Sequence, residues 1–156
     1  MSIVGWSLGG IYAREIARAA APLVRQVITL GSPYRLSDPR ATKARLLYEV
    51  GTTGHRTEAG RDTRTTTFNP PRPLPVPATS IYTRSDGVVP WEACVEGRSA
   101  TCESIEVFGS HSGLGHNPAV LWIIADRLAQ SEGTWRPFRP NGPIRFVLAG
   151  RRTTPL

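Results

Sequence analysis

This sequence of 156 residues lacks several features, and each absence narrows what the protein can do. It has no run of about 18 or more apolar residues, so we expect no membrane-spanning helix. The first residues, Met1 to Trp6, contain neither the basic segment nor the long apolar segment of a secretory signal. The location therefore stays open, with the cytoplasm as the default expectation.

Cysteine is scarce: the two cysteines are Cys94 and Cys102. Together with the three histidines, they show none of the spacings of metal-binding motifs, so we expect no metal site and no cofactor. The cysteines flank a polar, glycine-containing run, residues 95–101, that is typical of a hairpin-like turn. They are either ordinary thiols in a loop or the two ends of a short disulfide. We expect the disulfide, although it would be unusual in a reducing cytoplasm.

Acidic residues are absent from the end of the chain. Residues 133–156 contain five arginines and no acid, whereas residues 1–132 contain 14 basic and 12 acidic residues. The net charge of +7 is therefore concentrated in a basic, Pro/Arg-rich tail. No groove-reading or aromatic-rich module accompanies this charge, so we expect no nucleic-acid partner. We divide the chain into one domain, residues 1–132, and the tail, residues 133–156.

The pattern of the first thirty residues predicts a strand, a tight turn, a helix and a second strand. The first apolar run ends at Gly5, and a β-branched run from Val24 to Leu30 ends at Gly31. Between them, apolar residues recur at helical spacing at Leu8, Ile11, Tyr12, Ile16, Ala19 and Ala20. This βαβ unit predicts parallel strands.

Two more strands, near residues 79–83 and 104–108, and a second helix are expected further along. Asn117 as N-cap and Pro118 as first residue predict where this helix begins. Its expected apolar face consists of Val120, Leu121, Ile124, Ala125 and Leu128. Residues 34–76 are rich in Arg, Thr, Pro and Gly, and predict a lid-like insertion with a short helix near residues 41–50. The expected class is α/β, with a mostly parallel sheet of about four strands and flanking helices.

Gly5-Trp6-Ser7-Leu8-Gly9 matches the pattern G-x-S-x-G. Alone the match is weak, since a glycine-rich turn can contain an incidental serine. Here it falls where a strand turns into a helix, a strained corner that presents a serine hydroxyl at the carboxyl end of a sheet. We therefore expect Ser7 to be a nucleophile and the Leu8 N–H to stabilise an oxyanion. Trp6, beside the serine, is a candidate for contacting substrate.

A serine nucleophile needs a carboxylate that orients its base. Asp86 is the best candidate because it directly follows a predicted strand in a polar turn. The alternative is an aspartate that only caps its own turn. Asp38 lies in the insertion and Asp126 lies within the last helix, so both fit worse.

The base itself must be a histidine on a loop at the same sheet edge. His111 follows the last predicted strand in a loop of small residues, which makes it the preferred base. His116, five residues later, is the alternative; otherwise it would contact substrate or cap the helix. His55 lies in the insertion and is set aside.

The order Ser7, Asp86, His111 is that of the α/β-hydrolases. The segments GWSLGG, VITLGSP, IYTRSDGVVPW and GSHSGLGHNPAVLWIIADRLAQ resemble the carboxyl half of α/β-hydrolase lipases and esterases, over about residues 2–130. The resemblance implies hydrolysis of small-molecule carboxylic esters through an acyl-enzyme. It also implies that residues 34–76 form a lid or a wall of the acyl pocket. An acyltransferase or thioesterase would use the same triad.

The sequence departs from that family before the serine. The family's preceding strands, and an HGGG-type loop that supplies a second oxyanion N–H, have no counterpart here. We therefore expect either a fragment of a longer product or a partner chain that supplies the rest. A catalytically weak or silent assembly module is the alternative function. We also expect the N-terminal strand to be an exposed apolar edge that favours self-association.

Overall fold

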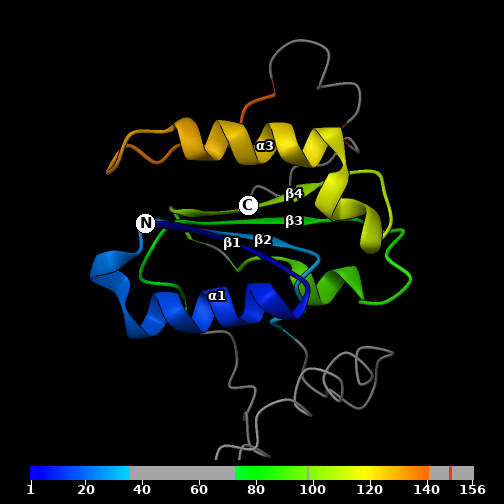
Figure 1. Ribbon diagram of the computed structural model, residues 1–156, viewed down its shortest axis with the longest axis horizontal. Coiled ribbons are helices and arrows are strands. Elements are labelled where there is room, and N and C mark those ends of the chain that lie inside the picture. The colour runs from blue at the N-terminus through cyan, green and yellow to red at the C-terminus, as the bar shows by residue number, and fades with distance from the viewer. Residues whose placement is uncertain (36–72, 98, 141–147, 149–156) are drawn as a thin grey trace, which may run out of the picture.

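The computed structural model of the protein describes residues 1–35, 73–97, 99–140 and 148. They form an α/β fold in which a four-stranded, all-parallel sheet lies between helices α1 and α3 (Figure 1). The strand order is β1-β2-β3-β4, with β1 Ser2–Trp6, β2 Gln26–Leu30, β3 Ala78–Tyr82 and β4 Cys102–Glu106. The expected fold class is confirmed. Most of the expected insertion, including the helix near residues 41–50, lies outside the described residues.

The inner strands β2 and β3 are buried along their whole length. A strand covered on both faces is typical of a parallel sheet with helices on each side. In the register, Trp6 pairs with Leu30, Leu30 with Ile81, and Tyr82 with Glu106. Because all strands run the same way, their carboxyl ends meet at one edge of the sheet. The segments that follow β1, β3 and β4 therefore begin close together.

Helix α1, Leu8–Ala19, packs closely against the sheet. A Cβ atom on Gly5 would come within 2.5 Å of the Gly10 Cα atom, so glycine is required at this contact. The helix buries Gly10, Ala13, Arg14 and Ala17. The helix predicted from the apolar spacing is present, but two of the residues used for that prediction, Tyr12 and Ile16, are exposed. Glycine or alanine at three of these four buried positions lets the helix approach the sheet closely.

Helix α3, Pro118–Ala129, begins as expected: Asn117 Oδ1 accepts a hydrogen bond from the Ala119 N–H at 2.9 Å. Its apolar face was predicted correctly at Val120 and Ile124, which pack into the core, and wrongly at the other positions. The buried residues are Ala119, Val120, Ile123 and Arg127, whereas Leu121 and Leu128 are exposed. In this orientation the helix turns Arg127 toward the sheet, where it forms an ion pair with Glu103 of β4. No helix within the described ranges has the length and apolar character needed to cross a membrane.

Two apolar layers make the core, one on each face of the sheet. The α3-side layer contains Ile28, Leu30, Ile81, Ile105, Val107, Leu114, Val120, Ile123 and Phe138. The α1-side layer contains Ala13, Ala17, Val24, Val27, Leu74, Val76, Ala78 and Cys102. Leu74 and Val76 were assigned to the insertion, and Phe138 to the tail, yet all three are buried in these layers. Three short 3₁₀ helices complete the described elements: η1 Ala21–Leu23, η3 Trp91–Cys94 and η4 Ser112–His116.

The expected disulfide between Cys94 and Cys102 is not formed: both are free, buried thiols. Cys94 ends η3 and packs with Tyr82 and Val89. Cys102 begins β4, pairs with Ala78 at the other end of β3, and belongs to the α1-side layer. The thiols therefore lie in different apolar clusters, which explains why the intervening segment does not bring them together. Burial raises the pKa of both thiols.

Candidate active site

Ser7 occupies the corner between β1 and α1 with an unusual backbone conformation. Its φ of 53° makes it the one non-glycine residue with positive φ in the described part of the chain. The Ser7 N–H donates to the Leu30 carbonyl at 2.8 Å, which holds the corner against β2. The side chain is buried and forms no hydrogen bond with the helix that it precedes. The hydroxyl is therefore turned to the sheet edge instead of capping the helix.

His111 lies between Ser7 and Asp86 and contacts both. Its Nε2 atom is 3.0 Å from Ser7 Oγ, and its Nδ1 atom is 2.7 Å from Asp86 Oδ2. The His111 and Asp86 side chains are 6% and 2% exposed. The three side chains predicted from the sequence are thus brought into one hydrogen-bonded chain, from segments that follow β1, β3 and β4.

Asp86 uses its two carboxylate oxygens differently. Oδ1 accepts hydrogen bonds from the N–H groups of Val88, at 2.9 Å, and Val89, at 2.8 Å. Oδ2 accepts from His111. The two alternatives considered for Asp86 therefore occur together: it caps its own turn, and that turn fixes the second oxygen against the imidazole.

Gly31 lies beneath the contact between Asp86 and His111, a role that the sequence pattern did not indicate. It ends the β2 segment with a φ of +51°. A Cβ atom at this position would come within 2.9 Å of Leu114 Cδ1 and within 3.3 Å of both Asp86 Oδ2 and His111 Nδ1. A larger residue would therefore disturb the pair. The sequence feature that could have indicated this role is a glycine immediately after a strand at this edge of the sheet.

The remaining predicted residues are Trp6, Leu8 and His116. Trp6 contacts His111: the indole N–H donates to the His111 carbonyl at 3.1 Å. Leu8 is the first residue of α1, where helix N–H groups have no acceptor within the helix. His116 ends η4 and is exposed, and the cap of α3 is formed by Asn117 instead. Of the two candidate bases, the structure places His111 beside Ser7.

A buried ion pair joins the helix that follows Ser7 to the segment that follows Asp86. Arg14 of α1 pairs with Glu96, and its guanidinium lies 3.7 Å from the centre of the Tyr34 ring. The Tyr34 hydroxyl donates to the Cys94 carbonyl at 2.8 Å. Burial raises the pKa of Tyr34, so the phenol keeps the proton that it donates. This cluster could not be predicted from the sequence, because a charged residue on a helix is usually exposed.

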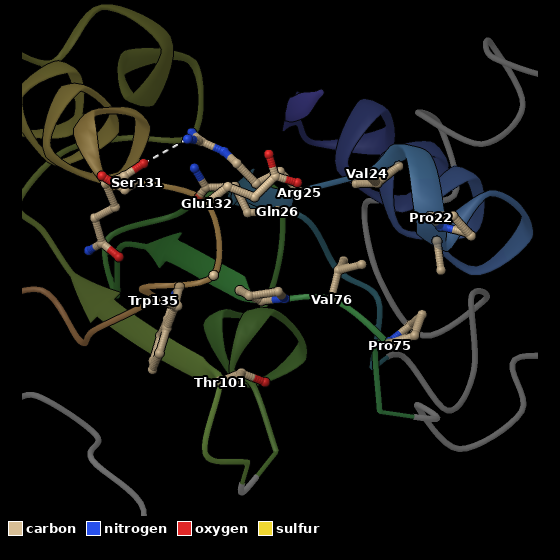
Figure 2. A pocket seen from close by; sticks show the side chains of 14 residues that line it. Pro22, Val24, Arg25, Gln26, Pro75, Val76, Thr101, Ser131, Glu132 and Trp135 are labelled. Carbon is tan, nitrogen blue, oxygen red and sulfur yellow. Dashed lines mark hydrogen bonds between the residues drawn. The ribbon is translucent and has the colours of Figure 1, made fainter.

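A cavity of about 360 Å³ lies away from these residues, at the opposite end of the sheet. It is lined by the segments before β2 and β3 and by the chain after α3, including Arg25, Val76 and Trp135 (Figure 2). The Arg25 side chain, which belongs to this lining, donates hydrogen bonds to the Gln130 and Leu128 carbonyls. Because strand amino ends form this cavity, it is separate from the site around Ser7.

Comparisons with known proteins add no family to these observations: no protein-family model matches the chain, and no curated protein matches it significantly. Within the described ranges, no three His, Cys, Asp or Glu residues are grouped so that they could hold a metal ion. The geometry around Ser7 is therefore the basis for inferring a function.

Proposed function

We propose that the protein is a serine hydrolase that cleaves carboxylic esters through an acyl-enzyme. Ser7 would be the nucleophile, His111 the general base and Asp86 the carboxylate that orients it. The observation that carries this proposal is the continuous set of contacts from Ser7 Oγ to His111 Nε2, at 3.0 Å, and from His111 Nδ1 to Asp86 Oδ2, at 2.7 Å. A serine with positive φ between a strand and a helix supports it, because a nucleophile elbow has this geometry.

Each side chain has a defined step in the reaction. Asp86 Oδ2 accepts the Nδ1–H of His111, which leaves the Nε2 lone pair facing Ser7. Nε2 takes the Ser7 proton as Oγ attacks the ester carbonyl, and then gives that proton to the departing alcohol. In the second half, Nε2 takes a proton from the water that attacks the acyl-enzyme. It then gives that proton to Ser7 Oγ as the carboxylic acid leaves, which regenerates the Ser7 hydroxyl.

The negative oxygen of each tetrahedral intermediate needs hydrogen-bond donors. The Leu8 N–H suits this role because it directly follows the nucleophile, at the amino end of α1, where the helix dipole favours negative charge. The chain order and the parallel sheet support a lipase or esterase of the α/β-hydrolase type. The triad leaves the acyl acceptor open, so transfer to another alcohol, or cleavage of a thioester, would use the same residues.

The first test is covalent labelling. The protein should react with a fluorophosphonate probe at Ser7 and hydrolyse p-nitrophenyl butyrate. Ser7→Ala should do neither, whereas Ser112→Ala, which changes an exposed serine in the His111 loop, should behave as the wild type. Equal labelling of wild type and Ser7→Ala would remove Ser7 as nucleophile. A folded wild type that neither labels nor hydrolyses would reject the proposed function.

The same assay tests the choice of base. His111→Ala should lower kcat by about 10⁴-fold or more, because Ser7 loses its proton acceptor. His116→Ala should have little effect, because His116 is exposed and lies beyond the contacts of the triad. The opposite ranking of the two variants would transfer the role of base to His116.

A further inference from the structure

We propose that Trp6 is a positioning residue for the base, and that its indole holds His111 between Ser7 and Asp86. This inference depends on the proposed function of those three residues. It differs from the role that the sequence suggested for Trp6, which was contact with substrate. The two roles have different kinetic consequences, so they can be separated by experiment.

Trp6 contacts His111 in two ways. The indole Nε1–H donates to the His111 carbonyl at 3.1 Å, across 105 residues of sequence. The two rings are also close, with centroids 5.6 Å apart and planes inclined by 38°. Trp6 is the last residue of β1 and is directly followed by Ser7. The strand that presents the nucleophile therefore also contacts the base: the Trp6 side chain meets both the backbone carbonyl and the ring of His111.

The hydrogen bonds at the start of the His111 loop do not connect that loop to β1. The Thr83 hydroxyl donates to the Gly109 carbonyl at 3.1 Å, and the Asn117 amide donates to the Phe108 carbonyl at 2.7 Å. Both fix the start of the loop, two or three residues before His111, and neither reaches β1. Near His111 itself, the Leu114 N–H donates to the Ser110 carbonyl at 3.1 Å and lies 3.4 Å from the His111 carbonyl, which makes the second bond weak. The indole N–H is the shorter of these two contacts to that carbonyl.

The position of Trp6 is also hard to explain by burial alone. Trp6 is 46% exposed, whereas His111 is 5% exposed. An indole at the surface contributes less to the core than a buried one, yet here it lies against a buried imidazole. The ring therefore shields the imidazole from water, which would otherwise compete for the hydrogen bonds to Ser7 and Asp86.

The test compares three substitutions. Trp6→Leu removes both the ring and the N–H, Trp6→Phe keeps an aromatic ring but removes the N–H, and Trp122→Leu makes the same change at an exposed tryptophan of α3. Trp6→Leu should lower kcat about 100-fold, the effect expected of a misplacement of about 1 Å. Trp6→Phe should lower it about tenfold, for one lost hydrogen bond. KM should stay within about twofold in both, since the substrate contacts are unchanged. Trp122→Leu should match the wild type.

A second readout does not depend on turnover. The proton between His111 Nδ1 and Asp86 should give a strongly deshielded proton NMR signal in the wild type, absent from His111→Ala. Trp6→Leu should broaden this signal through faster exchange with water, with a smaller effect in Trp6→Phe and none in Trp122→Leu. A wild type that shows the signal but does not react with the probe would reject the proposed function, while the signals of the variants would still decide the role of Trp6.

Three outcomes would overturn the inference. The first is an unchanged NMR signal and kcat in Trp6→Leu. The second is a rise in KM with unchanged kcat, which would assign Trp6 to substrate contact. The third is equal kcat in Trp6→Phe and the wild type, which would show that the hydrogen bond to the His111 carbonyl positions nothing. If Trp6→Leu does not fold, the conservative Trp6→Phe decides the question.

Discussion

At the residue scale, the backbone of Ser7 explains why its hydroxyl is available. A serine before a helix commonly accepts a hydrogen bond from the second or third N–H of that helix. Ser7 precedes α1, but its φ of 53° and ψ of −123° turn the side chain away from these groups. Such a conformation costs about 1–3 kcal/mol. The hydrogen bond to Leu30 and the close packing of Gly5 on Gly10 hold it in place, so Ser7 Oγ contacts His111 instead.

The two cysteines allow a prediction from burial. Burial raises the pKa of Cys94 and Cys102, and the thiolate is the reactive form. At a given pH, the native protein should therefore react with a thiol reagent far more slowly than free cysteine does. Each buried thiol has a higher pKa in the folded protein than in the unfolded chain, so its protonated form favours folding. This contribution to the free energy of unfolding is fully present below the unfolded-state pKa and is lost as the pH rises through the alkaline range.

The measurement is a thiol titration without reductant, in native buffer and in denaturant. Two free thiols per chain should be found after denaturation, and both should react slowly before it. Glutathione in the same buffers supplies the control for the reagent. Zero thiols in denaturant would show that the disulfide forms in solution after all.

At the element scale, the buried pair of Arg14 and Glu96 joins α1 to the segment after η3. Their side chains are 2% and 6% exposed, so removing one partner leaves the other charge buried without compensation. Arg14→Met should lower the free energy of unfolding by about 3–5 kcal/mol. Adding Glu96→Leu should recover much of this loss, because replacing both charges by apolar groups is often nearly neutral.

Urea denaturation measures these differences through the shift in midpoint at constant slope. Glu15→Gln is the matched control, since Glu15 pairs with Arg18 on the same helix but is 64% exposed, and we expect it to cost under about 1 kcal/mol. A double variant that is less stable than Arg14→Met would contradict the argument that the uncompensated charge is the main cost.

Helix limits could be predicted from local chemistry, but helix orientation could not. The start of α3 follows from Asn117 and Pro118, which act within one turn of the chain. Which face is buried depends on the sheet beneath the helix, and no local pattern contains that information. Leu121 is apolar yet exposed, and Arg127 is charged yet buried because Glu103 of β4 accepts its hydrogen bond.

The candidate site, too, could be predicted only in part. Ser7, Asp86 and His111 could be selected because each lies on a segment that directly follows a predicted strand, and parallel strands end at one edge. The contacts of Trp6 and Gly31 could not be predicted, since they arise between segments that are far apart in sequence. For Trp6 the sequence suggested contact with substrate, and only the hydrogen bond to His111 indicates a different role.

At the scale of the whole molecule, β1 is an edge strand of the described sheet. Side chains alternate along a strand, so Val4 and Trp6 point away from α1, on which Gly5 packs. Val4 is 43% exposed and Trp6 46%. An edge that combines free backbone N–H and carbonyl groups with exposed apolar side chains is a template for pairing with another strand. We expect a second copy of this chain to pair there, with the two β1 strands antiparallel around a two-fold axis.

Val4→Lys should therefore shift the protein toward the monomer, because a lysine on an edge strand opposes pairing while leaving the strand itself intact. Tyr12→Lys is the control, since Tyr12 is 52% exposed but lies on α1 and not on the edge strand. Sedimentation velocity over a range of concentrations would measure the association. The wild type and Tyr12→Lys should show a dimer that grows with concentration, and Val4→Lys should show much less of it. If the wild type stays monomeric throughout, or if both lysine variants weaken the dimer equally, β1 is not the surface that pairs.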